Sequence, residues 1–319
     1  MAVQRFPGFI DIHVHLRDPG QTHKEDFTTG SKAAIKGGFT FICDMPNNLM
    51  PTVNMDRLQE KIDLSQKKAI CDVGFHYGTD GNNLDSFAEA AASVHVFGLK
   101  IYCNHTTGNL LVEDETKLDS IFASWKSEKP ILVHAEEQKL ALCLALAKTY
   151  GRRLHACHVA NISEIDLIRK APDTVTAGVT PNHLFLSSGV MKPPLNKGSQ
   201  TALWEALVDG TIDLVESDHA PHIKEEKEKR AYGVPGLETT VGLLLKKDKK
   251  SPLNTWLYEN PKRIFHIPDQ PDTYVELDPD KPWIVGEDGY ETKCGWSPFD
   301  GWELYGKVEK VILYGKSIY

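Results

Sequence analysis

Four histidines and one aspartate stand at the ends of short apolar segments, where their side chains could bind metal ions. His13 and His15 are two residues apart, and side chains at that spacing on a strand point to the same face. His134, His158 and Asp218 each end a later apolar segment. A histidine pair alone would be interpreted equally well as two buried histidines, but five ligand-type residues at successive segment ends indicate a metal site.

Five protein ligands suit two metal ions with a shared bridge better than one tetrahedral zinc ion. Lys100 lies in the apolar segment 96–102, where a cation is costly to bury. Alone, it would be interpreted as a lysine whose amine reaches solvent at the rim. Beside two divalent cations, a neutral lysine that has added carbon dioxide is an anionic carbamate with one oxygen for each metal. We interpret Lys100 as this bridge, on condition that the histidine cluster binds metals.

Eight short apolar segments alternate with segments of helical period, a pattern typical of βα units. The expected strands are Phe9–Val14, Thr40–Cys43, Ala69–Phe75, Val96–Tyr102, Ile131–His134, Leu154–Val159, Thr174–Val179 and Ile212–Ser217. The expected helices are Asp26–Lys36, Met55–Gln66, Ser86–Ser93, Glu136–Tyr150, Ser163–Lys170, Ser199–Val208 and Leu237–Lys246. We therefore predict an α/β fold, a (β/α)8 TIM barrel over residues 1–250, whose active site lies at the carboxyl ends of its strands.

Residues 251–319 differ in character, with segments rich in proline, aspartate and glycine followed by the alternating run Val308–Tyr314. We expect a small C-terminal extension here, made of a helix, loops and terminal strands that pack on the barrel. The charge-rich stretches Lys224–Arg230 and Lys246–Lys250 are interpreted as solvated surface loops without a chemical role.

Composition excludes several classes of function. The chain has 319 residues and a formal net charge of −8, which argues against nucleic-acid and anionic-membrane partners. Its longest apolar run, Leu140–Ala147, is too short to span a bilayer, and the first nine residues do not resemble a signal peptide. Six cysteines without paired spacing are typical of reduced thiols, so we expect a cytoplasmic protein.

Ordered motifs along nearly the whole chain resemble those of dihydroorotases, members of the cyclic amidohydrolase superfamily. The motifs are Gly8-Phe-Ile-Asp-Ile-His13-Val-His15-Leu-Arg17-Asp-Pro-Gly20, Asp44-Met-Pro-Asn47, Gly98-Leu-Lys100-Ile-Tyr102, Val133-His134-Ala-Glu136, Cys157-His158-Val-Ala160, His183-Leu-Phe-Leu186, Ser217-Asp218-His-Ala-Pro-His222 and Pro235-Gly-Leu-Glu-Thr239. Asn260–His266 and Asp272–Glu276 extend the likeness to the dihydroorotase domain of the animal multifunctional pyrimidine-synthesis protein.

This resemblance implies the barrel fold of amidohydrolases, with the extension as a reduced β-sandwich. It implies two Zn²⁺ per chain, bridged by hydroxide and by carboxylated Lys100 (N6-carboxylysine). The set His13, His15 and Asp218 would bind one ion, and the pair His134 and His158 the other. The implied reaction is the reversible cyclisation of N-carbamoyl-L-aspartate to L-dihydroorotate and water in de novo pyrimidine biosynthesis, with Asp218 as the catalytic proton carrier. A homodimer and association with aspartate carbamoyltransferase are expected as well.

The substrate is an anion, so an acidic chain needs a local cationic site to bind its carboxylate. Arg17 lies two residues past His15 and offers a planar, bidentate donor. The resemblance adds further substrate-binding residues from loops at the same rim: Asn47, Thr106, Lys192, His222 and Gly236. Lys192 takes the place of an arginine or asparagine of related enzymes, and the loop Cys103–Gly108 is where a mobile lid would lie.

The sequence departs from the resembling pattern at three points. Cys157 and His183 could hold a third metal, but Gly178 stands where animal-type domains offer an acidic residue, so we favour two metals over three. Thr107 replaces an aromatic residue of the loop. The barrel pattern begins almost at the first residue, so any sandwich is expected to come from the tail.

Two alternatives stay open. Dihydropyrimidinases, hydantoinases and allantoinases share the metal-binding residues but bind neutral or differently shaped rings. A non-catalytic barrel used as a scaffold would have lost ligands, whereas this chain has all six.

Overall fold

A computed structural model describes residues 3–319 of the chain, and eight parallel strands form its central sheet in the order of the sequence. The strands are β2 (Phe9–Val14), β3 (Phe39–Asp44), β4 (Asp72–Gly78), β5 (Val96–Tyr102), β6 (Ile131–His134), β7 (Leu154–Ala156), β8 (Val175–Val179) and β9 (Leu214–Val215). A parallel bridge between Val14 and His219, and a 2.8 Å hydrogen bond from the His15 N–H to the His219 carbonyl, join the last strand to the first. The predicted barrel is confirmed.

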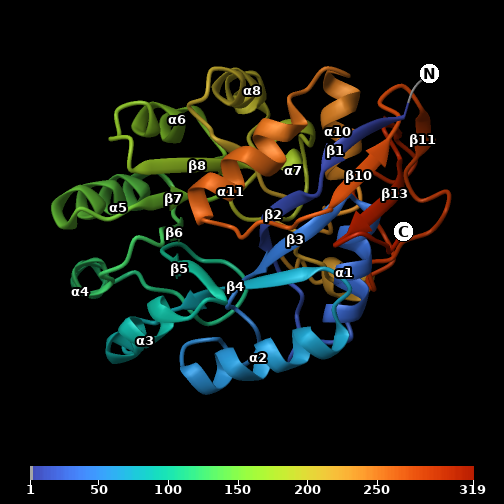
Figure 1. Ribbon diagram of the computed structural model, residues 1–319. Helices are drawn as coiled ribbons and strands as arrows, with labels where there is room; N and C mark the ends of the chain where they lie inside the picture. The colour runs from blue at the N-terminus through green and yellow to red at the C-terminus, as the bar shows by residue number, and fades with distance from the viewer. Residues whose placement is uncertain (1–2) are drawn as a thin grey trace.

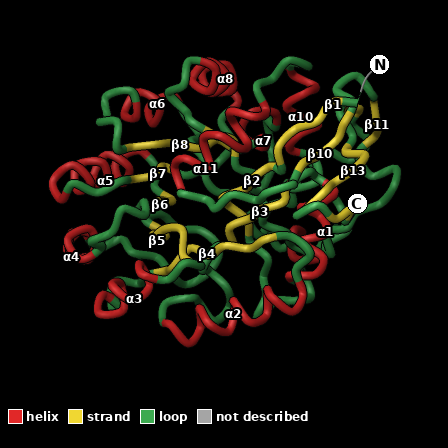
Figure 2. Tube along the Cα trace, in the orientation of Figure 1, coloured by secondary structure: helices red, strands yellow, loops and turns green. Residues whose placement is uncertain are grey.

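Helices lie around the outside of this sheet, with the strands at the centre (Figure 2). They are α1 (Phe27–Lys36), α2 (Met55–Lys68), α3 (Phe87–Ala92), α4 (Glu115–Ser124), α5 (Glu137–Tyr150), α6 (Ile162–Ile168), α7 (Pro181–Phe185), α8 (Gln200–Val208), α9 (Lys224–Glu228) and α10 (Thr240–Lys247), with 3-10 turns η1 (Leu84–Ser86) and η2 (Lys197–Ser199). Buried apolar side chains such as Leu58, Leu118 and Leu203 fill the layer between helices and strands. Most of the stabilising apolar burial therefore lies outside the barrel.

Helix α1 shows how local sequence sets the element boundaries. Asp26 caps its first turn by accepting a 2.9 Å hydrogen bond from the Thr29 N–H, while the Thr29 hydroxyl accepts from the Asp26 N–H. Gly37 ends the helix and Gly38 continues at φ +87, a conformation that favours glycine. The chain then enters β3 directly at Phe39.

The amino-terminal end of the barrel is closed by η3 (Thr255–Glu259), a π-helical turn, and by α11 (Asn260–Phe265), which lies across the strands in Figure 1. Ile264 and Phe265 pack on apolar side chains that the barrel strands contribute at this end, including Phe41 and Leu214. Arg153 donates a 2.6 Å hydrogen bond to the Ile264 carbonyl. Only the opposite, carboxyl-terminal end is left for a site.

A second, antiparallel sheet lies beside the barrel, in the strand order β1-β10-β13-β14. Its strands are β1 (Gln4–Pro7), β10 (Tyr274–Leu277), β13 (Val308–Leu313) and β14 (Lys316–Ser317), and β11 (Pro282–Ile284) pairs separately with β12 (Glu303–Tyr305). Figure 1 shows the blue β1 alongside the orange β10. The expectation that such a sheet comes entirely from the tail is wrong, because the N-terminus supplies one strand. The division into residues 1–250 and 251–319 stays a prediction.

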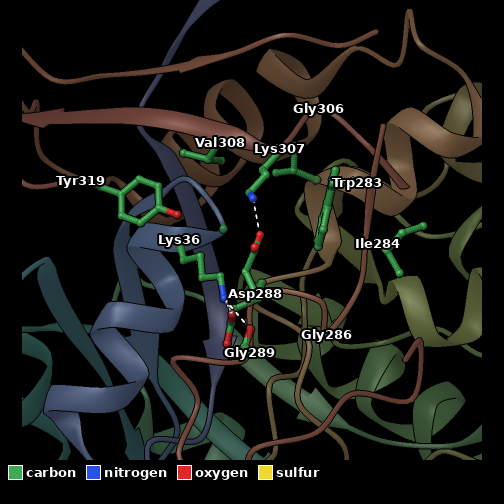
Figure 3. A pocket seen from close by; sticks show the side chains of 14 residues that line it. Lys36, Trp283, Ile284, Gly286, Asp288, Gly289, Gly306, Lys307, Val308 and Tyr319 are labelled. Carbon is green, nitrogen blue, oxygen red and sulfur yellow. Dashed lines mark hydrogen bonds and ion pairs between the residues drawn. The ribbon is translucent and has the colours of Figure 1, made fainter. Parts of the chain in front are cut away.

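The tail also contacts the barrel through polar groups. Lys36 of α1 donates a 2.7 Å hydrogen bond to the Gly289 carbonyl and pairs with Glu238 at 2.8 Å. Figure 3 shows the pocket that these residues line, where Lys307 pairs with Asp288. The amines of Lys36 and Lys307 are thus both engaged by polar groups of this chain. Across residues 3–319, no helix is long and apolar enough to cross a membrane.

Candidate active site

Three of the predicted metal ligands converge where β2 ends and β9 has just ended. The ligand atoms of His13, His15 and Asp218 all lie within 4.8 Å of one another. The Asp218 Oδ1 is 3.1 Å from His15 Nε2 and 3.5 Å from His13 Nε2. Burial raises the pKa of Asp218, which opposes its ionised form.

His134 and His158 form a second pair at the ends of β6 and β7. His134 Nδ1 lies 2.9 Å from His158 Nε2, and both rings are buried. The His158 ring is also 5.1 Å from that of His13, between centroids. The two sets therefore lie side by side at one mouth of the barrel.

These separations fit metal ions. A tetrahedral zinc ion at about 2.0–2.1 Å from each nitrogen holds two ligand atoms about 3.3 Å apart. The distances of 2.9, 3.1 and 3.5 Å lie close to that value, so small shifts would bring each set onto one ion. Donors of this type suit zinc among other metals.

Lys100 lies fully buried in β5, and its Nζ donates a 3.1 Å hydrogen bond to the Cys157 Sγ. Among residues 3–319, the hydrogen-bond partner of this amine is the Cys157 thiol and not a carboxylate. A buried ammonium without an anionic partner is costly. The burial of Lys100 excludes the alternative of a lysine whose amine reaches solvent at the rim, and the bridging role stays a prediction.

Backbone conformation is unusual at several residues of the site. Arg17, His158 and Asp218 have φ values of +62, +39 and +45 without being glycine. Such conformations cost of order 1–3 kcal/mol each and persist where surrounding contacts impose them. They turn the chain sharply as it leaves β2, β7 and β9.

Two buried carboxylates that the sequence interpretation missed hold these strand ends. Asp11 accepts hydrogen bonds from the His13 N–H at 3.0 Å and from the Ser217 N–H at 3.2 Å, and burial raises its pKa to about 7. Glu216 accepts from the His158 N–H and lies 3.2 Å from His13 Nδ1. Although burial opposes ionisation, the histidine contacts hold the pKa of Glu216 below its usual value. Glu216 is two residues before Asp218, so the rule that paired His13 with His15 could have found it.

Arg17 follows His15 by two residues and is nearly fully buried. Its Nε donates to the Pro221 carbonyl at 3.3 Å, and one terminal nitrogen is 3.3 Å from His222 Nε2. Lys24 adds a second buried cation, with its Nζ 3.4 Å from His222 Nδ1. Burial, with the charges of Arg17 and Lys24, lowers the pKa of His222 to about 3. The ring is therefore neutral near pH 7, in a locally positive site.

The charged stretch after His222 takes part in this arrangement. Residues 224–228 form helix α9, and Glu226 pairs with Lys24 at 3.1 Å and with His222 Nδ1 at 2.9 Å. The interpretation of the stretch as a surface loop without a role is therefore wrong for Glu226, which screens the cations of the site.

Asn47 contacts a metal ligand and the following loop. Its Oδ1 lies 2.7 Å from His15 Nδ1, so that nitrogen carries the proton and Nε2 is free for a metal. Its Nδ2 donates to the Thr107 carbonyl at 3.0 Å. The neighbouring Thr106 is part-exposed in the same loop.

Lys192 and Gly236 lie in loops at the same mouth. Burial dominates in lowering the pKa of His134, and nearby positive charges, among them that of Lys192, lower it further. The Gly236 N–H lies 3.2 Å from His219 Nδ1, and a Cβ at this position would be 2.9 Å from the Ser217 carbonyl. Glycine thus permits the loop to approach the Asp218 segment.

Cys157 and His183, the residues considered for a third metal, have other partners. The His183 Nδ1 is 2.7 Å from the Thr180 hydroxyl and its Nε2 is 3.1 Å from the Pro193 carbonyl. Within residues 3–319, Cys157 groups instead with His13 and Glu216 as a candidate ligand set.

Parallel strands, external helices and this cluster at the carboxyl-terminal mouth define a barrel of the amidohydrolase type. The model of the amidohydrolase family matches residues 6–250. The chain is 35% identical to a dihydroorotase from Pyrococcus abyssi over 98% of its own length and 82% of the relative's. It therefore belongs to the amidohydrolase family and, within it, to the dihydroorotases.

Two further relatives are a much longer multifunctional protein and a solved domain of such a protein. The chain is 39% identical, over 99% of its length, to the multifunctional protein CAD of Squalus acanthias, but it spans only 15% of that protein. A solved structure described as the inactive dihydroorotase-like domain of the Chaetomium thermophilum CAD-like multifunctional protein matches with a TM-score of 0.83 and 26% identity, over 99% of this chain and 95% of that one. Sequence similarity therefore extends to a domain described as inactive, and activity has to be argued from the site.

Proposed function

We propose that this protein is a dihydroorotase, which catalyses the reversible cyclisation of N-carbamoyl-L-aspartate to L-dihydroorotate and water in pyrimidine biosynthesis. The observation that carries the proposal is the convergence of two ligand sets beside a buried arginine. Two metal ions would activate the ring amide for hydrolysis. A cationic side chain would bind the carboxylate that dihydroorotate has and neutral rings lack.

His13, His15 and Asp218 would hold one zinc ion, His134 and His158 the other, and carboxylated Lys100 would bridge them. When bound, the ions would supply positive charge for the amide carbonyl and an activated water at neutral pH. The lack of an anionic partner for Lys100 supports its modification, because a carbamate would replace a buried cation by a metal-bound anion.

Asp218 would carry the proton. Its carboxylate lies between His13 and His15 with 15% of the side chain exposed, so one oxygen can face the substrate. In ring opening it would accept a proton from the attacking water and deliver it to the leaving ring nitrogen, with the reverse order in cyclisation.

Arg17 would bind the substrate carboxylate, with Lys24 adding positive charge nearby. Arg17 donates one bond to the Pro221 carbonyl and one within the Arg17–His222 pair, which fixes the guanidinium and leaves further N–H groups for a bidentate contact. This local charge offsets the formal net charge of −8 for an anionic substrate.

Ring opening of L-dihydroorotate, followed by ultraviolet absorbance with and without chelator, tests the proposal. We expect turnover that chelation abolishes and about two zinc ions per chain. Turnover of hydantoin or dihydrouracil in place of dihydroorotate would favour the related cyclic amidohydrolases. Neither metal nor turnover would favour a scaffold, like the domain described as inactive. Homodimer formation, association with aspartate carbamoyltransferase and a cytoplasmic location stay predictions.

A further inference from the structure

Glu216 is a fully buried carboxylate that the proposed reaction does not use. It lies one residue past β9, and the two carboxylate oxygens face different elements of the metal centre. Oε1 accepts a hydrogen bond from the His158 N–H, and Oε2 lies 3.2 Å from His13 Nδ1. One side chain thus contacts a ligand of each predicted metal.

Each contact restricts how its histidine can bind a metal. The Glu216 Oε2 lies 3.2 Å from His13 Nδ1, so a proton on that nitrogen can pair with the carboxylate and leave Nε2, the nitrogen on the Asp218 side, as the free ligand. At His158 the bond holds a backbone N–H in a strained conformation with φ +39, which decides where the ring projects. Outer carboxylates of this kind fix the tautomer and orientation of metal-bound histidines.

The space for this carboxylate depends on the neighbouring strand. A Cβ built on Gly178 of β8 would lie 2.8 Å from the Glu216 Cδ and 3.0 and 3.1 Å from its two oxygens. Any larger residue at 178 would therefore displace Glu216, and its normal φ shows that glycine is not needed there for backbone conformation. Gly178 and Glu216 act as a complementary pair.

We propose that Glu216, in the space left by Gly178, is a positioning residue that couples the two metal subsites by holding His13 and His158. This inference rests on the proposed metal centre and adds a residue to it. A glutamine at 216 has one acceptor oxygen and one donor amide, so it can satisfy only one of the two N–H groups. Loss of outer partners of this type weakens metal binding about 10- to 100-fold.

The test compares metal affinity in wild type, Glu216→Gln and the control Glu164→Gln, by zinc competition with a chelator and by the absorption spectrum of the cobalt-substituted proteins. Glu164 is also buried and accepts two backbone N–H bonds, from Ala160 at 2.8 Å and Glu137 at 3.4 Å, but it contacts none of the predicted ligands. We expect weaker zinc binding by about 10- to 100-fold and a changed cobalt spectrum only for Glu216→Gln.

Gly178→Ala gives an independent test that removes no polar group, in case the first variant does not fold. It should weaken zinc binding in the same direction, because the new methyl group must push Glu216 aside. Wild-type affinity for zinc in folded Glu216→Gln, or in Gly178→Ala, would overturn the inference. So would a third equivalent of zinc that Glu216→Gln alone loses while the first two are unaffected. If the wild type itself bound no metal, the proposed function would fail first.

Discussion

Replacing Arg17 by lysine tests how the site distinguishes a carboxylated ring from a neutral one. The structure assigns partners to the Nε and to one terminal nitrogen of Arg17, through the Pro221 carbonyl and His222. Its remaining N–H groups are free to form two parallel bonds to a carboxylate. Lysine keeps the charge but offers one point contact, so about one charge-assisted hydrogen bond is lost.

A bond of this type contributes about 1.5–3 kcal/mol. Since 1.4 kcal/mol is tenfold, kcat/KM for L-dihydroorotate should fall roughly 10- to 150-fold. Any residual turnover of dihydrouracil, which lacks the carboxylate, should hardly change. The assay is ultraviolet ring opening with both substrates, on proteins of equal zinc content.

Arg169→Lys is the matched control, because Arg169 forms an exposed ion pair with Asp209 at 2.9 Å and is not part of the site. Its kcat/KM should equal that of wild type. The reasoning would be refuted if Arg17→Lys changed kcat/KM for L-dihydroorotate by less than twofold, or lowered turnover of both rings equally.

Three further predictions concern the same mouth of the barrel. Asp218→Ala should abolish turnover, measured with saturating zinc, because the proton carrier is lost; residual activity above a few per cent of wild type would contradict that role. Lys192→Ala should mainly raise KM, and an unchanged KM would remove Lys192 from the substrate site. The contacts of Glu226 with His222, His23 and Lys24 outweigh its burial and lower its pKa to about 2, so its stabilising contribution is complete above the unfolded pKa and is lost as pH falls toward 2. Glu226→Gln should therefore have a free energy of unfolding about 1 kcal/mol lower than that of wild type near pH 7, after solvent screening. In urea unfolding this difference should narrow below about pH 4.5, and a difference that stays constant with pH would contradict the assignment.

The barrel could be predicted because its strands are buried on both faces and read as short apolar runs. Strands 96–102 and 131–134 match the expected ranges residue for residue. The last strand does not: only Leu214 and Val215 form β9, within the expected segment 212–217. The chain leaves the ladder there as it turns toward the left-handed φ of Asp218, and a single aspartate is too weak a signal to locate that turn in the sequence.

The site was predicted to the extent that its chemistry is carried by residue types at strand ends. His13, His15 and Asp218 form one group, and His134 lies against His158. The carboxylates that support the site were not predicted, because their roles depend on residues that only the folded chain brings close to them. Glu226 stands in a run of charges that normally indicates a solvated surface, yet two of its partners are buried.

The small sheet was harder to predict because β1 is only four residues long and its partner, β10, is about 270 residues away in the chain. A short segment ending in proline has no pattern that distinguishes it from a loop. Its pairing is decided entirely by the tail that folds back onto it.

That pairing has a consequence for how the chain could be joined to other polypeptides. Strands β1 and β14 are the two edges of one four-stranded sheet, and its register places Ser317 opposite Pro7. Residues 4 and 317 are therefore about three strand spacings apart across the sheet and three residues apart along it, or roughly 18 Å in all. The sheet adjoins the amino-terminal end of the barrel, where β1 leads into β2 and Tyr314 contacts Asp72 at the start of β4. Tethers or fusion partners attached at both positions would therefore leave from one side of the molecule, and substrate could still enter from the other.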